Sequence, residues 1–274
     1  MANNITNTEA TAFVTEVWSM EIIEETNPKM VLGDLVWRFD DESKKSNDTI
    51  HVPSLSNLEV NDKVPNLGVT KQAPTETNVD ILLDKHKETT FMVEDITELQ
   101  TNRTIRDMYT GKASTAIAKQ IDSDLAAMAS GFSQTFGTYN TAITADVILD
   151  SIEELDLNDV PEEDRHFVFR SDVKRDLLDI NAFVSADYVG GKPTETGNIG
   201  SLYGVSTYMS NNLVKTGNNT NNMLFHKEAL AMGMAQAPRI QTEYSLEDLG
   251  WLTVVDTVYG VKEMRDDFGV LVKT

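Results

Sequence analysis

Hydrophobic positions near the N-terminus follow helical spacing. Thr6 and Glu9 have the spacing of a capping box, and an apolar stripe follows at Phe13, Val14, Val17, Trp18 and Ile22. Asn27-Pro28 ends the pattern, because the residue before a proline disfavours helical backbone. The spacing predicts a short amphipathic helix whose stripe needs a covering surface, on the rest of the chain or on a neighbour.

Residues 32–78 offer little material for a core. VLGDLVWRF and TIHVPSL each predict a strand, the DDESKKSND between them is wholly polar, and the rest up to Asn78 is rich in Pro, Asn and Thr. Long connections of this kind are usually functional or disordered. A two-stranded arm of about 15–18 residues each way would reach about 50–60 Å. Such a hairpin is only marginally stable unless it lies on another molecule.

The middle of the chain predicts a strand pair and then an unusually long helix. VDILLDKHKETTFMVED alternates well enough for two strands around the polar stretch 84–88. From 101 to 131 the apolar residues follow helical spacing, at Ile105, Met108, Ile117, Ile121, Leu125, Met128 and Phe132. About 30 residues at about 1.5 Å each span about 45 Å, so this helix would act as a strut.

The second half mixes helical and strand patterns, which makes the chain α+β. Helices are predicted at 145–156 and 172–178, a strand at HFVFR (166–170) and a glycine-rich loop at 185–203. Further strands are predicted at GVSTYMS, at NMLF with the alternating ALAMGMA, at RIQTEY, and through WLTVVDTVYGVKEM and FGVLVKT to the chain end. A final strand usually pairs inside a sheet.

Composition narrows the possible functions. The 274 residues include 44 acidic and 23 basic ones, a formal charge of −21, and no cysteine. The lack of cysteine excludes disulfides, thiolate nucleophiles and cysteine-held metals. The acidic charge disfavours sequence-reading DNA proteins, which need Lys and Arg to displace counterions. Solubility, a halophilic or marine source, or a container whose inner wall must not hold DNA would each account for it. No apolar run predicts a membrane span, and the first residues lack a secretory signal.

The motifs predict no catalytic, cofactor or metal site. No histidine has metal-ligand spacing, and hydrogen-bonded structural roles are expected for all of them, at His51, His86, His166 and His226. Gly191-Lys192 is not a phosphate-binding loop, since Pro193 stands where Ser or Thr would hold magnesium. The acidic residues between 156 and 164 lack the glycine of an EF-hand and predict a solvated turn.

Taken in order, several segments resemble the major capsid proteins of tailed bacteriophages, which share the Hong Kong 97 fold. NDTIHVPSL is similar to the family's extended-loop strand, and VDILLDKHKETTFMVEDI to the strand pair before its spine helix. DLNDVPEEDRHFVFRSDVKRDLL resembles the helix–strand–helix passage of the axial domain. GNIGSLYGVSTYMSNNL, LFHKEALAMGMAQ and VYGVKEMRDDFGVLV resemble its closing strands. Each segment alone is unspecific, but together they cover nearly the whole chain in the family's order.

The resemblance implies an L-shaped α+β subunit in four parts. These are an N-terminal arm at 1–31, an extended loop at 32–78, a peripheral domain at 79–140 and 250–274 with a spine helix at 101–131, and an axial domain at 141–249. Hexamers and pentamers of this non-enzymatic protein would close an icosahedral shell around double-stranded DNA, without sequence-specific contacts, cofactor or membrane. A scaffolding protein, a portal and a decoration protein are the implied partners. Assembly would take place in the host cytoplasm, and the product is the capsid of the virion.

Some relatives carry a scaffolding segment before the arm. Here the arm begins within ten residues of Met1, which favours a separate scaffolding protein. Two other functions stay open. An encapsulin-type nanocompartment shares the fold but holds protein cargo, so the identity of the cargo would separate the two. A monomeric acidic α/β enzyme with an unrecognised site would form no particles in the electron microscope.

Candidate inter-subunit contacts follow from the implied extended loop. Lys44-Lys45 would form a basic loop tip, with Arg38 nearby. We hypothesise that these cations lie against carboxylates of an adjacent subunit, on or beside its spine helix. The acidic candidates are Glu98, Asp107, Asp122 and Asp124. One exposed ion pair contributes only about 0–1 kcal/mol, but a closed shell repeats it in every subunit.

The apolar stripe gives a first testable prediction. Trp18→Ala should impair assembly more than folding of the subunit, because Trp18 is expected to pack where the arm meets a neighbour or the spine helix. Burial of such a side chain contributes about 2–3 kcal/mol, repeated around the shell. Particle yield and thermal stability measure the effect, and normal shells from this variant would contradict the prediction.

Overall fold

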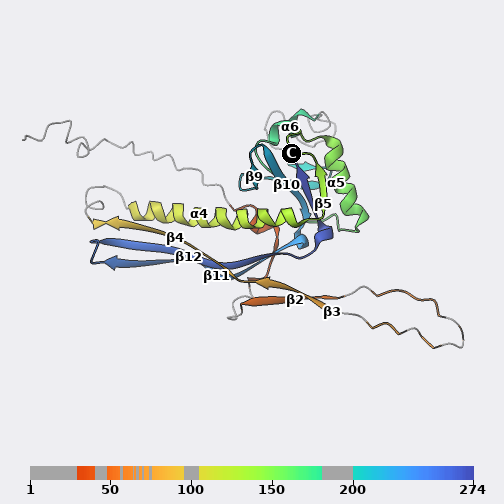
Figure 1. Cartoon of the computed structure of the whole chain (residues 1–274), viewed down its shortest axis with the longest axis horizontal. Helices are drawn as coiled ribbons and strands as arrows, with labels where there is room; N and C mark the ends of the chain where they lie inside the picture. The colour runs from red at the N-terminus through yellow and green to blue at the C-terminus, as the bar shows by residue number, and fades with distance from the viewer. Residues whose placement is uncertain are drawn as a thin grey trace, which may run out of the picture.

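A computed structural model gives the three-dimensional arrangement of the chain. It describes residues 30–40, 48–55, 58–63, 65, 68–69, 71–73, 76–95, 105–180 and 200–274. These residues form an elongated α+β body with a long helix on a four-stranded sheet at one end, a second sheet at the other, and a projecting hairpin (Figure 1). The expected α+β class is confirmed. The predicted N-terminal helix and Trp18 lie outside the described residues.

The long predicted helix is confirmed over the part that the structure describes. It is α4, Ile105–Met128, continued by the short 3-10 turn η1, Ala129–Gly131. Every fourth residue on one face is buried, at Ala113, Ile117, Ile121 and Leu125, which is the spacing of a stripe that packs on a flat surface. That surface is a sheet with the order β1-β11-β12-β4, made of Trp37–Arg38, Leu230–Ser245, Gly250–Glu263 and Lys85–Glu94.

Strand β11 corrects one sequence expectation. ALAMGMA and RIQTEY, predicted as separate strands, are two parts of one 16-residue strand that pairs with β12 along its length. The pairing register shifts between Met234 and Gln236 and again between Gln236 and Arg239. Pro238 lies inside the second shift, where its missing N–H removes no regular ladder bond. The irregularity therefore bends the strand without ending it.

The second sheet has the order β5-β13-β10-β6-β8-β7, with β9 paired to β10. Its strands are Gln134–Gly137, Gly269–Lys273, Asn219–His226, Arg165–Phe169, Val205–Met209, Ser201–Leu202 and Lys215–Thr216. Helices α5, Ala145–Leu157, and α6, Lys174–Asp179, contribute Leu155 and Leu177 to the core of this half. The prediction that the last strand pairs inside a sheet is confirmed, since β13 lies between β10 and β5.

Neither of the ranges expected for the peripheral and axial domains is confined to one sheet. Strand β11, from within 141–249, pairs with β12, whereas β13, from within 250–274, pairs with β10. The chain passes between the sheets at three short 3-10 turns, η1, η2 (Lys227–Ala229) and η3 (Asp266–Phe268). Hydrogen bonds join these turns, because Ala229 O accepts from Met264 N at 2.8 Å and Asp266 accepts from Ser133 N at 2.7 Å.

The first described residues form a helix where the sequence predicts a strand. Leu32–Leu35 is the one-turn helix α1, and only Trp37–Arg38 extends, as β1, to pair in parallel with β11. The cause is Asp122 of α4, whose carboxylate accepts from the N–H groups of Val31, Leu32 and Gly33 at 2.8, 3.1 and 3.3 Å. These are the groups that a helix N-terminus leaves without partners. Because the acceptor is 90 residues away in the sequence, no local pattern could reveal it.

Asp122 is completely buried and receives a fourth hydrogen bond, from the side-chain amide of Asn212 at 3.1 Å. Burial raises the pKa of Asp122, against the opposing effect of its hydrogen bonds. Leu32, Leu35 and Val36 follow directly and pack into the same core as α4. Asp122 therefore joins the start of the body, the long helix and the loop before β9. We call this arrangement the Asp122 anchor.

Asp122→Asn tests the anchor. The amide replaces one acceptor oxygen with an NH₂ group that faces backbone donors, so at least one buried N–H loses its partner. We expect a loss of about 2–3 kcal/mol in the free energy of unfolding, since an unpaired buried polar group costs about 1–3 kcal/mol. Urea unfolding followed by tryptophan fluorescence measures it. The control Asp150→Asn, at an exposed position of α5, should stay within about 0.5 kcal/mol of wild type; equal effects of both variants would refute the anchor.

Candidate inter-subunit surfaces

The projecting hairpin is the first candidate surface. Its strands β2, Thr49–Leu55, and β3, Glu76–Leu82, pair in a continuous antiparallel register from Thr49↔Leu82 to Leu55↔Glu76. Four residues farther along each strand, Glu59 N donates to the side chain of Gln72 at 2.9 Å, and Gln72 donates back to Glu59 O. These bonds hold residues 59 and 72 side by side beyond the last assigned strand pair. Figure 1 shows the hairpin extending well past the body.

The base of the hairpin is held by close packing on the four-stranded sheet. Ile50, Ile81 and Leu83 form a small core with Ala231 of β11. Glycines permit the contact: a Cβ on Gly233 would lie 2.7 Å from Ile50 Cδ1, and one on Gly260 would lie 2.0 Å from Leu82 O. Ile50 and Ile81 face each other in the register, so one face of the ribbon is apolar and points toward the body.

Farther out, where the body no longer covers it, this face carries both apolar and charged side chains. Side chains alternate between the two faces of a strand, so Leu58 and Val60 lie on the face of Ile50. The pairing of Glu59 with Gln72 puts Val69 on that face as well, opposite Asp62, and puts Lys71 opposite Val60. Leu58, Val60 and Val69 are 68, 101 and 68% exposed. The sequence carried this signal as isolated apolar residues in a polar stretch, and our sequence analysis missed it.

Lys44 and Lys45 lie outside the described residues, so their place and their contact stay predictions. The described chain on either side of them is at the body. Phe39 N donates to Met232 O at 2.9 Å, and Asp48 O accepts from Leu83 N at 2.9 Å. Strand β2 begins just after this point, so the free end of the hairpin lies near residue 65. Lys63 and Lys71 are the basic residues closest to that end in the sequence.

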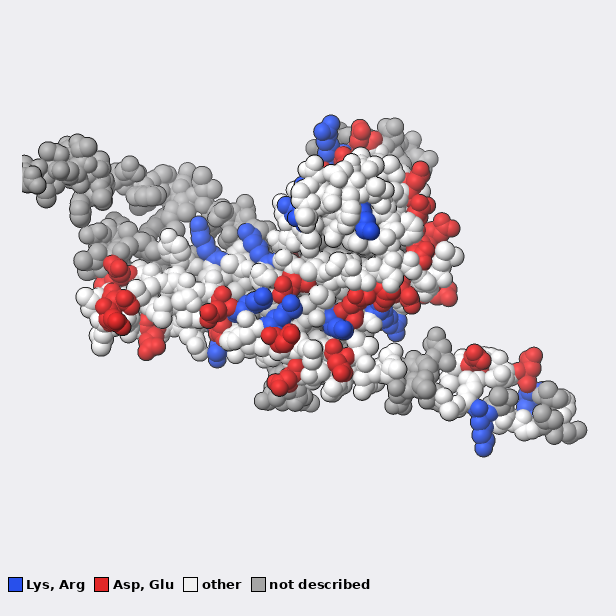
Figure 2. All heavy atoms as spheres, viewed as in Figure 1, with Lys and Arg blue, Asp and Glu red and all other residues white. Residues whose placement is uncertain are grey.

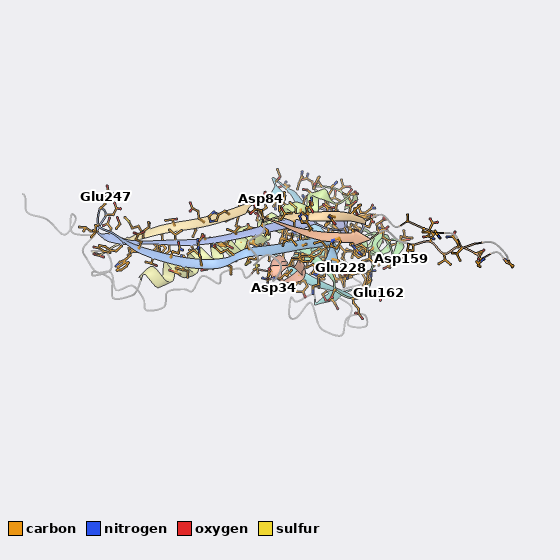
Figure 3. The ribbon with its side chains drawn as sticks, turned by 90° about the horizontal axis from the view of Figure 1, so that it is seen from below. Asp34, Asp84, Asp159, Glu162, Glu228 and Glu247 are labelled. Carbon is orange, nitrogen blue, oxygen red and sulfur yellow. The ribbon has the colours of Figure 1, made fainter. Side chains whose placement is uncertain are left out.

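The outer face of the four-stranded sheet is the second candidate surface. On the side away from α4, Met92 of β4 and Leu252 of β12 are direct neighbours, and Val254 of β12 follows two residues on. Met92 is 39% exposed. Figure 3 shows the hairpin over the half of the sheet near Asp84, and no described segment over the half toward Glu247. Glu88, Glu94 and Glu243 lie on the same face by register. We call Met92, Leu252, Val254 and these glutamates the distal sheet face.

The buried carboxylate of Asp256 and the exposed Arg239 form an ion pair that fixes the irregular part of β11 next to this face. Asp256 of β12 accepts from Arg239 Nε at 2.8 Å and Nη2 at 3.1 Å, and from Gln236 at 2.9 Å. The exposed ring of His86, on β4, contributes a third contact to Asp256 at 3.2 Å. The Arg239 guanidinium holds the pKa of Asp256 far below its usual value. The three strands are thus locked together where the register shifts.

Two acidic residues proposed as inter-subunit contacts have partners within the subunit. Asp122 is buried in its anchor, so it cannot meet a neighbour's lysine. Asp124 accepts from Tyr259 Oη at 2.8 Å and pairs with Lys85 Nζ at 3.3 Å, which ties α4 to β12 and β4. Burial acts to raise the pKa of Asp124, but these two partners and Gln120 outweigh it and lower the pKa. These two assignments are corrections to the sequence hypothesis.

The remaining contact candidates stay predictions. Arg38 is exposed and binds Asp40 at 2.7 Å, with Asp34 at 3.7 Å, so part of its charge is compensated inside its own subunit. Glu98 lies outside the described residues, and only the backbone of Asp107 is described, within α4.

The histidines and the acidic turn show no arrangement for chemistry. His51 contacts Asp80 at 2.6 Å, and His226 Nδ1 accepts from Glu228 N at 3.2 Å. His166 differs from the expectation, since its Nδ1 is buried without a partner and its ring packs edge-on against Tyr208 and Phe225. Burial lowers the pKa of both His166 and His226.

In the acidic turn, Asp156 pairs with Arg165 at 2.7 Å. Across the part of the chain that the structure describes, no cluster of three His, Asp or Glu side chains could hold a metal. None of the described helices is long and apolar enough to cross a membrane.

Similar folds occur in known virus structures. A structure from Mycobacterium phage Che8 is 26% identical, covers 99% of this chain and 98% of its own, and superposes with a TM-score of 0.80. The capsid structure of the cyanophage P-SCSP1u shares the fold at 17% identity, with 99% and 96% covered and a TM-score of 0.78. The capsid of Ralstonia phage GP4 shares it at 10% identity, with 100% and 98% covered and a TM-score of 0.76.

A search of curated protein sequences found no match. The sequence itself matches the family model described as phage capsid protein over residues 33–264. This match spans most of the chain, including α1, the hairpin, α4 and both sheets except β13. The expected phage capsid fold is confirmed, and the chain belongs to the phage capsid protein family.

Proposed function

We propose that this protein is the major shell subunit of a tailed phage and that its hexamers and pentamers close an icosahedral capsid around double-stranded DNA. Its family gives it a structural role in a homo-oligomeric capsid. One observation carries the detailed proposal: the hairpin exposes Leu58, Val60 and Val69 on the face that packs on the body at its base. A hairpin with such a face lacks support inside its own subunit.

The distal sheet face of an adjacent subunit fits the exposed hairpin face. At the base, the hairpin already packs its apolar face on the outer side of β11 and β12. The register puts Met92, Leu252 and Val254 in the distal half of that side. Figure 3 shows no described segment over this half. Packing the outer part of the hairpin there would bury apolar surface on both partners. In this arrangement each subunit supports its neighbour's hairpin, and residues 1–31 and 32–78 become the parts that link subunits.

The charge of the protein suits a container for DNA. Figure 2 shows acidic side chains at the distal end of the sheet and along the side that carries α5. The total of −21 would keep the shell from binding phosphates tightly. A scaffolding protein, a portal and a decoration protein are the proposed partners, with assembly in the host cytoplasm. No role as an enzyme is proposed.

Particle formation is the direct test. Expressed together with its scaffolding protein, the chain should sediment as particles of megadalton size that negative-stain microscopy shows as closed shells. A compact monomer under all these conditions would overturn the proposal. Nucleic-acid content separates the candidate containers, because a phage capsid packages DNA with its portal, whereas an encapsulin-type shell would contain protein cargo.

Val60→Asp tests the hairpin contact, with Asn61→Asp as a matched control. Both variants add one carboxylate to an exposed position of the same strand, but their side chains lie on opposite faces. We expect Val60→Asp to lower particle yield at least tenfold while the isolated subunit unfolds as in wild type. Asn61→Asp should assemble normally. Similar yields from the two variants would show that this face of the hairpin makes no contact in the shell.

A further inference from the structure

A basic groove runs between α4 and the second sheet. Its walls include Ala116, Lys119 and Ser123 of α4 on one side, and Arg170 with the segment Asn211–Lys215 on the other. We call it the α4 groove. Ala116, Leu213 and Val214 give it an apolar strip between polar edges.

The α4 groove concentrates positive charge in a strongly acidic protein. Lys119, Arg170 and Lys215 line it, and one carboxylate, Asp172, serves both Arg170 and Lys215. Arg170 also donates to Asn211 O at 2.7 Å and Leu213 O at 3.0 Å, so its position is fixed. Lys119 is exposed and has no ion pair or hydrogen bond within the described residues. Asp122 lies behind Asn212, but it is buried and its oxygens are occupied.

The N-terminal segment starts from this groove. Val31 N and the side-chain amide of Asn212, which lines the groove, bind the same Asp122 oxygen at 2.8 and 3.1 Å. Residue 30 is therefore next to one end of the groove. Lys119 is three residues from Asp122 on α4, about 5 Å along the helix axis.

Residues 1–29 have the complementary charge. They contain five glutamates and a single basic residue, Lys29. Glu24 and Glu25 precede residue 30 by only five or six positions, and an extended chain of that length reaches about 15–20 Å. Pro28 favours extended backbone at Asn27. The short tether keeps these carboxylates at a high effective concentration near Lys119.

We propose that residues 21–25 occupy the α4 groove of their own subunit, with Glu24 and Glu25 against Lys119 and Arg170. This contact holds the root of the N-terminal segment along α4 before assembly. Exposed ion pairs are weak and screened by salt, so the segment is released easily when a neighbour offers a larger contact. The inference concerns the free subunit and does not depend on how shells form.

Disulfide trapping in the unassembled subunit tests the proposal cleanly, because the chain has no cysteine. Glu25→Cys with Ser123→Cys places one thiol on the segment and one in the groove. The full-length protein, kept dilute, is oxidised and then read by mass and by non-reducing gel. We expect an intramolecular disulfide at least fivefold faster than in Glu25→Cys with Arg175→Cys, whose second thiol lies on α6. Equal urea midpoints of the reduced variants confirm that both fold.

Charge variants of Lys119 test whether the contact is electrostatic, and the size of the disulfide product tests whether it forms within one chain. In the Glu25→Cys, Ser123→Cys protein, Lys119→Glu should slow disulfide formation at least threefold, whereas Lys119→Arg should leave its rate unchanged. In 0.5 M salt (about 4 Å Debye length) the rates with Lys119 and with Lys119→Glu should lie closer together. A dimeric product would show that the segment docks on another copy, and no preference over the α6 control would show that it docks elsewhere. Either result overturns the proposal, as does a rate that ignores Lys119→Glu. Shell formation can succeed or fail independently of each.

Discussion

Asp122 places a carboxylate beneath the first turn of the described chain, and the positions of the other parts depend on that contact. Its oxygens satisfy three backbone N–H groups of residues 31–33 and the amide of Asn212. Burying a charge is unfavourable unless hydrogen bonds replace its water. Four donors do so here, although the pKa is still raised. From this fixed point α1 directs β1 onto β11, and β11 then supports the base of the hairpin. Residues 31–33 and the base of the hairpin are thus set relative to α4 with the help of one side chain.

The subunit is built to present long surfaces rather than an enclosed site. The core lies in thin layers, with α4 on one side of a four-stranded sheet and the hairpin base on the other. Hydrogen-bonded charges such as Asp124 and Asp256 tie strands to each other and to α4. Each of these side chains thus has a structural partner within the subunit.

Sequence reasoning was accurate where local pattern decides structure. The stripe of every fourth residue predicted α4, and alternation predicted β4, β8, β10 and β12, because burial on one face imposes those periods. It failed where a contact with a residue far away in the sequence determines the local structure. Leu32–Leu35 has the apolar character of a strand but is helical because Asp122 supplies its missing acceptors. That the described hairpin begins only at Thr49, paired with Leu82, was likewise not readable from composition. Asp122 and Asp124 were expected to be exposed, because the helical pattern shows nothing of their partners. Those partners lie 90 or more residues away in the sequence.

The charge of the chain limits what can hold copies together. Each subunit brings a formal −21 to a contact with an identical partner, and like charges within a Debye length of about 8–10 Å repel. Cations that remain near acids of their own subunit, such as Arg38 and Lys85, do not offset this repulsion. Burial of apolar surface is insensitive to the sign of charge. In the proposed arrangement, Leu58, Val60 and Val69 supply an attraction that does not depend on charge, at a distance from the acidic body of their own subunit. The partner surface still carries Glu88, Glu94 and Glu243, so apolar burial there has to outweigh the cost of desolvating these carboxylates.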